Sequence, residues 1–284
     1  MPHLARYQIS ILQLILAMFK ASPGADNLKI LSSHLHRNPS LTNLAQKLAN
    51  SALFLGKNYA HLDSEAFAYQ FVDDLFGAQV ANVNKMLISD FIVNQMAAGV
   101  AQDQLIAELT HALSEIPTSD HNWGQAVIQH QINGINKILE HLLADTFTSN
   151  NWTIVKDHMI MQIVSGKTLG ETIVWAINTV ANVDADNIVW GGACKLFNNR
   201  LEVSKYYSIE MTGTSIDFIT TQEILSAVSD DRNTVDIAKS IIDSRMKNNA
   251  LSATSIDFQL YQTIKKLNDN PLHTNAAPTE LMVG

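Results

Sequence analysis

IQHQINGINKILEHLL, residues 128–143, is the stretch from which the fold class follows. Its apolar side chains recur in steps that alternate between four and three residues, which places them on one side of an α-helix. A stripe of this kind is typical of a helix that packs against several neighbouring helices. The positions are Ile128, Ile132, Ile135, Leu139 and Leu142.

The same periodicity recurs along much of the chain. Residues 41–55 carry an apolar stripe that begins after Pro39, with Ser40 in the position of a helix N-cap. Residues 105–116 carry a second stripe. A few short segments, such as residues 187–190, are compatible with either a strand or a helix. The sequence therefore predicts an all-α protein with two lobes, each made of several helices.

Two segments of the chain resemble each other, residues 6–58 and residues 66–116. In each segment an apolar helix ends at a turn of small residues, a middle helix follows, and a third helix carries leucines at matching positions. We therefore predict a duplicated helical unit of about sixty residues. The matching leucines are Leu44 with Leu105, and Leu48 with Leu109.

Turn-forming residues cluster in IPTSDHNWG, residues 116–124, and predict a boundary there. We expect an N-terminal helical lobe over residues 1–120 that holds the duplicated unit. A C-terminal helical lobe is expected over residues 121–249. Periodicity is lost near the end of the chain, which predicts a short helix and a tail over residues 250–284.

Composition excludes several classes of protein. The chain has 284 residues, 46% of them hydrophobic, and a formal net charge of −8. An acidic protein of this kind lacks the basic face of a nucleic-acid binder, so no nucleic-acid partner is expected. No stretch reaches the roughly 18 consecutive apolar residues of a membrane span, so no membrane insertion is expected.

The N-terminal apolar run, residues 9–19, is interrupted by Ser10 and Gln13. Its apolar residues fall at helical spacing and no clean cleavage site follows, which predicts a core helix rather than a signal peptide. The single cysteine, Cys194, excludes an internal disulfide framework. It is interpreted as a small buried residue, because no histidine lies near it in the sequence to activate a nucleophile.

Motifs of enzymatic chemistry are not found. Residues 166–168, Gly-Lys-Thr, resemble the end of a phosphate-binding loop, but Met161 stands where the first glycine is required. The metal-binding and hydrolase motifs with histidine or serine are also not found.

Calcium is the one cofactor that the sequence suggests. Asp184 and Asp186, in NVDADN, could offer oxygen ligands to a calcium ion. A calcium-binding loop counted from Asp184 would need glycine and glutamate where Val189 and Lys195 stand. A solvated turn is the favoured interpretation, and a calcium contact completed by another segment is the alternative.

Two of the four tryptophans are candidates for sugar binding. Trp123 and Trp152 lie beside turn residues, so we expect them to be exposed. An exposed indole offers a flat apolar face on which the C–H face of a pyranose can stack. Packing in the core is the alternative for each of them.

The most distinctive stretch is LFNNRLEVSKYY, residues 196–207, followed by TTQEILSAVSDDRNTVDIAKSIID, residues 220–243. This order of motifs resembles the N-terminal cell-anchoring region of Gram-negative, type I-secreted surface-layer proteins of the RTX-related kind. The duplicated helical unit also resembles the repeats found upstream in such proteins. Together the two likenesses cover about residues 6–245.

The resemblance implies a non-enzymatic domain that anchors a surface-layer protein by binding the O-antigen of lipopolysaccharide. It implies type I secretion without an N-terminal signal, an extracellular location on the outer surface of a Gram-negative bacterium, and neighbouring copies in a surface lattice as partners. The alternative is a helical linker or accessory domain of a secreted surface protein or enzyme, binding protein partners.

The candidate glycan contacts combine stacking aromatic side chains with amide and guanidinium groups that hydrogen-bond sugar hydroxyls. For the tyrosine pair, helix packing is the alternative to sugar binding. The calcium repeats and the β domain that such proteins carry are missing, which suggests an anchoring fragment or a separate anchoring subunit. The candidates are Trp123, Trp152, Asn198, Asn199, Arg200, Tyr206 and Tyr207.

Overall fold

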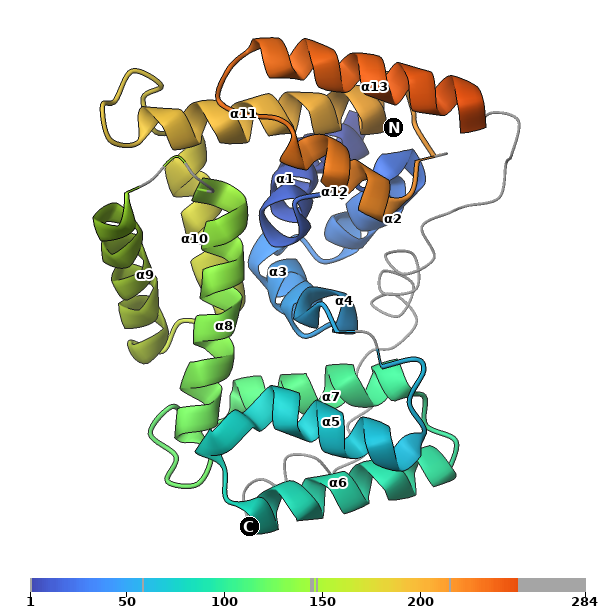
Figure 1. The fold of residues 1–284 in the computed structure, drawn as a ribbon, viewed down its shortest axis with the longest axis vertical. Helices are drawn as coiled ribbons and strands as arrows, with labels where there is room; N and C mark the ends of the chain where they lie inside the picture. Colours follow the sequence, from blue (N-terminus) through green and yellow to red (C-terminus); the bar gives the residue numbers. More distant parts are fainter. Residues whose placement is uncertain (1, 58, 144–145, 147, 215, 250–284) are drawn as a thin grey trace.

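The computed structural model describes residues 2–57, 59–143, 146, 148–214 and 216–249. Over these residues the chain forms thirteen α-helices and no strand, which confirms the all-α prediction (Figure 1). The predicted short helix and tail, residues 250–284, lie outside the described residues. The helices are α1 (Pro2–Phe19), α2 (Gly24–Arg37), α3 (Leu41–Ala49), α4 (Ala52–Leu55), α5 (Ser64–Phe76), α6 (Asn82–Ala97), α7 (Gln102–Glu115), α8 (Gly124–Leu143), α9 (Ser149–Val164), α10 (Leu169–Ala181), α11 (Gly191–Lys205), α12 (Phe218–Ser226) and α13 (Asn233–Asn249), with a 3-10 turn, η1 (Gly77–Gln79), and a π-helical turn, η3 (Tyr206–Glu210).

The two segments predicted to be duplicates share three helices in order but are not identical. Residues 6–58 contain most of α1 and all of α2 and α3, with the short α4 at the end, and residues 66–116 contain most of α5, then η1, α6 and α7. The leucines paired between the two segments all lie in the core: Leu44, Leu48, Leu105 and Leu109.

A second and more regular repeat continues beyond this pair. Helix α6 begins at residue 82 and α9 at 149, α7 begins at 102 and α10 at 169, and α8 begins at 124 and α11 at 191. Each pair is therefore separated by 67 residues. Helices α6, α7 and α8, with the end of α5, form what we call the first unit. Helices α9, α10 and α11, with the end of α8, form the second unit.

The turns between the helices repeat with the same spacing. Asp120 Oδ1 accepts the backbone N–H of Trp123, and Asn187 Oδ1 accepts that of Trp190, each at 2.8 to 2.9 Å. The glycine after each tryptophan cannot be replaced without movement, because a Cβ atom on it would lie 2.3 Å from a carbonyl oxygen of the preceding turn. The same Asx-turn with Trp-Gly thus starts α8 and α11.

The hydrophobic residues form two separate cores. The smaller core joins α5, α6 and α7 to the start of α8, and the larger one joins α1, α2 and α3 to the end of α8 and to α9–α13. Helix α8 runs through both, as Figure 1 shows. The predicted division at residue 120 does not coincide with this division, because residues 11–54 pack in the core of the C-terminal helices.

The packing of α3 on α10 explains why the first helices join the C-terminal ones. The side chain of Gln46 accepts the backbone N–H of Gly170 at 2.9 Å, across more than a hundred residues of chain. Helix α1 also contacts helices of both groups, among them α2, α8 and α11, and residues 11–18 are buried apart from the half-buried Gln13. The apolar N-terminal run is thus a core helix, as predicted. Among the described residues, no helix has the length and apolar character needed to cross a bilayer.

Candidate binding site

Two of the predicted glycan ligands on α11 are buried and bonded to the chain itself. Asn199 donates its side-chain N–H to the carbonyl of Ser229 at 3.0 Å. Arg200, 3% exposed, donates to the carbonyl of Val228 at 3.3 Å and to that of His141 at 3.0 Å. Both side chains tie α11 to the connection between α12 and α13, and the arginine also ties it to α8. Because they are buried and occupied, neither is available to a sugar, and this part of the prediction is wrong.

The tyrosine pair also holds the fold together. Tyr207 is 1% exposed, and its hydroxyl accepts the N–H of Ile216 at 2.9 Å and donates to the carbonyl of Ile216 at 3.1 Å. The alternative of helix packing therefore holds for Tyr207. Tyr206 is half-buried and donates to the carboxylate of Asp243 at 2.7 Å, a hydrogen bond that raises the pKa of its phenol. Its ring lies 5.2 Å from the Lys239 ammonium group.

Glu202 is a site of strong electrostatic interaction that the sequence analysis did not single out. Its carboxylate accepts from both terminal nitrogens of Arg232, in a forked ion pair, and from Lys239 at 2.7 Å. The hydrogen bonds from Arg232, followed by those from Lys239, lower the pKa of Glu202 to about 2. The polar side chains of residues 196–207 thus mainly hold α11 against α13 and the connection between α12 and α13.

The two candidate tryptophans differ in position. Trp123 is 3% exposed and lies against Phe76, with the ring centroids 5.2 Å apart. The expectation that it is exposed is wrong, because the turn capped by Asp120 directs the indole into the smaller core. Trp152, near the start of α9, is partly buried against the larger core and keeps part of its ring in solvent.

The remaining candidates are exposed and gather at one end of the molecule. Asp184 and Asp186 lie in the exposed turn between α10 and α11, and Asn198 lies on the exposed side of α11. This turn, the start of α11 and the start of α9 lie at the same end of the fold (Figure 1). We call Trp152, Asp184, Asp186 and Asn198 the end surface.

The charged and polar groups of the end surface contact one another or residues beside them. Lys195 lies 3.8 Å from the carboxylate of Asp186, and Asp184 accepts the backbone N–H of Asp186 at 3.0 Å. Asn198 donates to the sulfur of Cys194 at 3.3 Å. Cys194 itself is buried and donates to the carbonyl of Val183, as expected for a small structural residue, and burial raises the pKa of its thiol.

The two aspartates alone do not make a calcium site of the usual kind. Within the described ranges, no group of three or more histidine, cysteine, aspartate or glutamate side chains could hold a metal ion. Calcium prefers six to eight oxygen ligands. A calcium ion at Asp184 and Asp186 would therefore need further oxygen ligands besides these two carboxylates, such as carbonyl groups, amide side chains or waters.

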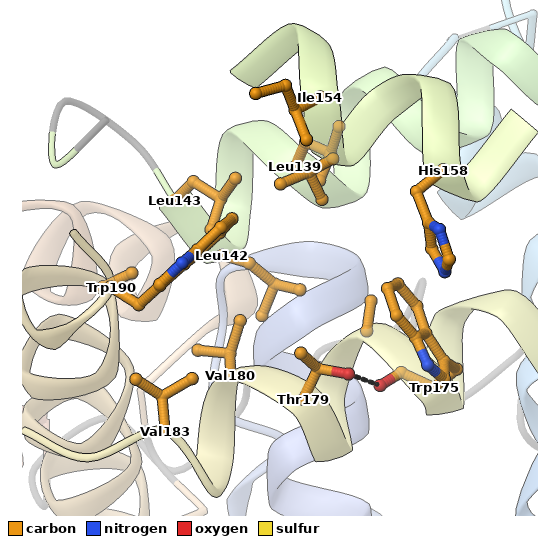
Figure 2. A pocket seen from close by; sticks show the side chains of 13 residues that line it. Leu139, Leu142, Leu143, Ile154, His158, Trp175, Thr179, Val180, Val183 and Trp190 are labelled. Atoms are coloured by element: carbon orange, nitrogen blue, oxygen red, sulfur yellow. Dashed lines mark hydrogen bonds between the residues drawn. The ribbon is translucent and has the colours of Figure 1, made fainter. Parts of the chain in front are cut away.

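An open apolar pocket lies beside the end surface, between α8, α9, α10 and α11 (Figure 2). Its volume is about 270 Å³. Leu139, Leu142 and Leu143 of α8 form one wall, and Trp175 and Trp190 stand toward opposite ends. His158, on α9, is exposed and places its imidazole 4.8 Å from the Trp175 ring. The sequence analysis missed this pocket.

A sequence signal for the pocket does exist. The dipeptide Trp-Gly occurs at residues 123–124 and again at residues 190–191, each time three residues after an aspartate or asparagine. That repeat would have aligned the two units and marked Trp190 as the counterpart of Trp123.

Comparison of the chain with protein-family models, with curated protein sequences and with solved structures finds no match. The fold and the end surface are therefore the basis for a functional proposal.

Proposed function

We propose that the chain is a non-enzymatic anchoring domain that holds a surface-layer protein on the O-antigen of lipopolysaccharide. The observation that carries this proposal is the end surface: its indole is partly exposed, its two carboxylates and its amide are exposed, and the starts of α9 and α11 and the turn before α11 lie at one end of the fold. An indole face and a set of hydrogen-bonding groups are what the recognition of a pyranose requires.

Each group in the end surface has a distinct role in this proposal. Trp152 orients a sugar ring by stacking, Asn198 donates to and accepts from hydroxyl groups, and the two aspartates accept from hydroxyl groups. Single contacts of this kind are weak. Repetition of the same contacts by neighbouring copies in a surface lattice supplies the avidity that an anchor needs.

Net charge also bears on how attachment works. The chain carries a net charge of −8, and the outer surface of a Gram-negative bacterium is acidic, so long-range electrostatics oppose contact. Binding must rest on the sugars. In this proposal the one role of a cofactor is to bridge: a calcium ion would be bound by Asp184, by Asp186 and by an anionic sugar. The proposed location, outside the cell, follows from the ligand, and the resemblance to surface-layer proteins implies type I secretion as the route.

The test compares binding of the purified chain to lipopolysaccharide with and without O-antigen, with and without a calcium chelator. Trp152→Ala and Asn198→Ala should each weaken binding to the O-antigen form by about tenfold, equivalent to 1.4 kcal/mol. Tyr69→Ala is the matched control, because it removes an exposed aromatic ring from α5, a helix that packs in the smaller core. Equal binding to the two forms of lipopolysaccharide would contradict the proposal.

A partner-binding linker is the second candidate, and the outer face of α6 favours it. Val83, Met86 and Leu87 are each more than half exposed on adjacent turns. An exposed apolar face on one helix is typical of a protein contact. This function gains support if the chain does not discriminate between the two forms of lipopolysaccharide and Met86→Asp weakens its self-association.

A further inference from the structure

The apolar pocket occupies the place that the first unit fills with its own side chains. A shift of 67 residues maps each pocket residue onto a residue of the first unit, for example Leu143 onto Phe76 and Trp190 onto Trp123. Of the thirteen pocket residues, ten have counterparts that are buried in the smaller core. The same arrangement of helices is therefore closed in one copy and open in the other.

Several substitutions between the units remove volume at this place: Leu109, Leu113 and Ile88 are replaced by the smaller Ala176, Val180 and Val155, and two phenylalanines are also replaced. Phe76 packs against Trp123 in the first unit, and its counterpart Leu143 presents no ring to Trp190. Phe91 packs against the smaller core, and its counterpart His158 stays exposed at the edge of the pocket. The second unit thus lacks two phenyl rings from its interior. The resulting volume, about 270 Å³, exceeds the roughly 150 Å³ of an engineered cavity that binds benzene.

The shape of the pocket is elongated. The residues that α10 contributes extend from Trp175 to Val180, which at 1.5 Å per residue is about 7.5 Å along the helix, and Val183 and Trp190 continue the lining beyond its end. The walls between these ends are mainly aliphatic, and Figure 2 shows leucines of α8 facing Val180 and Val183 across the space. The hydroxyl of Thr179 donates to the carbonyl of Trp175 at 2.9 Å and so is already bonded within its own helix.

The exposed polar side chains of the lining are His158 on α9 and Thr179 on α10, and the Thr179 hydroxyl is bonded within its own helix. Ile154 is exposed beside His158, so a bound molecule can enter there and keep a polar group in solvent near the imidazole. An interior without hydrogen-bonding groups disfavours a sugar, because its hydroxyls would lose their bonds to water. The same interior favours a molecule whose buried part is hydrocarbon.

We propose that this pocket binds one alkyl chain of an amphiphile, with the polar head group outside at His158. The proposal is independent of O-antigen binding, which rests on the end surface. Length favours a chain over a single ring, because the slot extends between Trp175 and Trp190 at its opposite ends and most of the side chains between them are aliphatic.

The experiment titrates the purified chain with hexyl, heptyl, octyl and nonyl glucosides below their micelle concentrations, followed by calorimetry and tryptophan fluorescence. Affinity should rise about fourfold per added methylene group, the equivalent of 0.8 kcal/mol, until the slot is filled. Glucose alone, which has the head group without the chain, should not bind to the pocket. Affinity that does not depend on chain length would overturn the proposal.

A variant that copies the closed unit makes the test specific. Leu143→Phe with His158→Phe restores both rings, and it should weaken octyl glucoside binding by more than tenfold. Thr179→Leu adds a larger side chain at an exposed position of the lining and should also weaken octyl glucoside binding. It replaces the double variant in the test if that variant fails to fold. Met86→Phe, which adds a ring on the exposed face of α6, is the control and should bind like the unmodified chain.

The outcome is separable from that of the functional proposal. The double variant should keep its binding to O-antigen lipopolysaccharide, since none of the end-surface residues is changed. Undiminished alkyl binding in folded Leu143→Phe/His158→Phe and in Thr179→Leu would show that the chains bind elsewhere, and the pocket proposal would be rejected.

Discussion

Replacement of Arg200 by alanine should destabilise the fold strongly without changing which ligand the folded protein binds. The guanidinium group is buried and donates to backbone carbonyls of two different elements, at His141 and Val228. The sequence motif suggested a ligand to sugar hydroxyls, whereas these contacts give the side chain a structural role. The substitution therefore discriminates between two functions for one residue.

The magnitude follows from the contacts that are lost. Each hydrogen bond from a charged donor contributes about 1.5–3 kcal/mol, and its loss leaves a buried carbonyl with a missing partner. Truncation of a buried charged side chain from its partners typically costs about 3–5 kcal/mol. For a chain of this size, the midpoint of thermal unfolding should fall by about 10 °C. Arg200→Lys should be intermediate, because a single ammonium group cannot reproduce the fork that serves both carbonyls.

The assay is thermal or urea unfolding followed by circular dichroism, with Asn198→Ala as the control two positions away on the exposed side of α11. The control should alter the free energy of unfolding by less than about 0.5 kcal/mol. Binding to lipopolysaccharide is then measured on the folded fraction of Arg200→Ala. An unchanged melting temperature, or a loss of binding in a variant as stable as the unmodified chain, would refute this assignment.

Two further predictions concern pH and the two cores. Burial lowers the pKa of both His130 and His141 to about 4, so below pH 6.5 the unfolded chain binds protons that the folded chain does not. The free energy of unfolding should therefore be highest above pH 6.5 and fall as the pH drops toward 4, by up to about 3 kcal/mol for each histidine. Urea unfolding at several pH values measures this, and His130→Gln should make the pH dependence shallower. A free energy of unfolding that stays constant from pH 7 to 4.5 would contradict the prediction. Leu48→Ala and Leu109→Ala should each lower the free energy of unfolding by about 2–5 kcal/mol. Because Leu48 lies in the larger core and Leu109 in the smaller one, the loss in the double variant should equal the sum of the two single losses within about 0.5 kcal/mol. A much smaller or larger combined loss would show that the two cores are coupled.

Local patterns predicted the helices well because each depends on neighbours close in sequence. The stripe of residues 128–143 lies in one long helix, and Ser40 caps α3 as expected, accepting the N–H of Asn43 at 3.1 Å. The matching leucines of the first two segments are all buried. These features need only helical periodicity and side-chain bonds that span three or four residues.

The candidate site was predicted less well, because a motif does not show which way its side chains face. Asn198 and Asn199 are adjacent in the sequence, yet one is exposed and the other is bonded to the loop before α13. Trp123 and Trp190 follow equivalent turns, yet one is packed in a core and the other borders an open pocket. In each case the difference lies in what packs opposite the side chain.

The sequence by itself determined the acidic charge, the all-α class that the described residues show, the core role of the N-terminal apolar run and the burial of the leucines in the two similar segments. Only the tertiary structure decided that residues 11–54 share a core with the C-terminal helices, that Arg200 and Tyr207 hold the fold together, and that one of two like units is open. The physical reason is the distance along the sequence over which each kind of interaction acts. Helix formation and capping are settled within a few residues, whereas burial depends on contacts between helices that are far apart in sequence, such as α3 and α10.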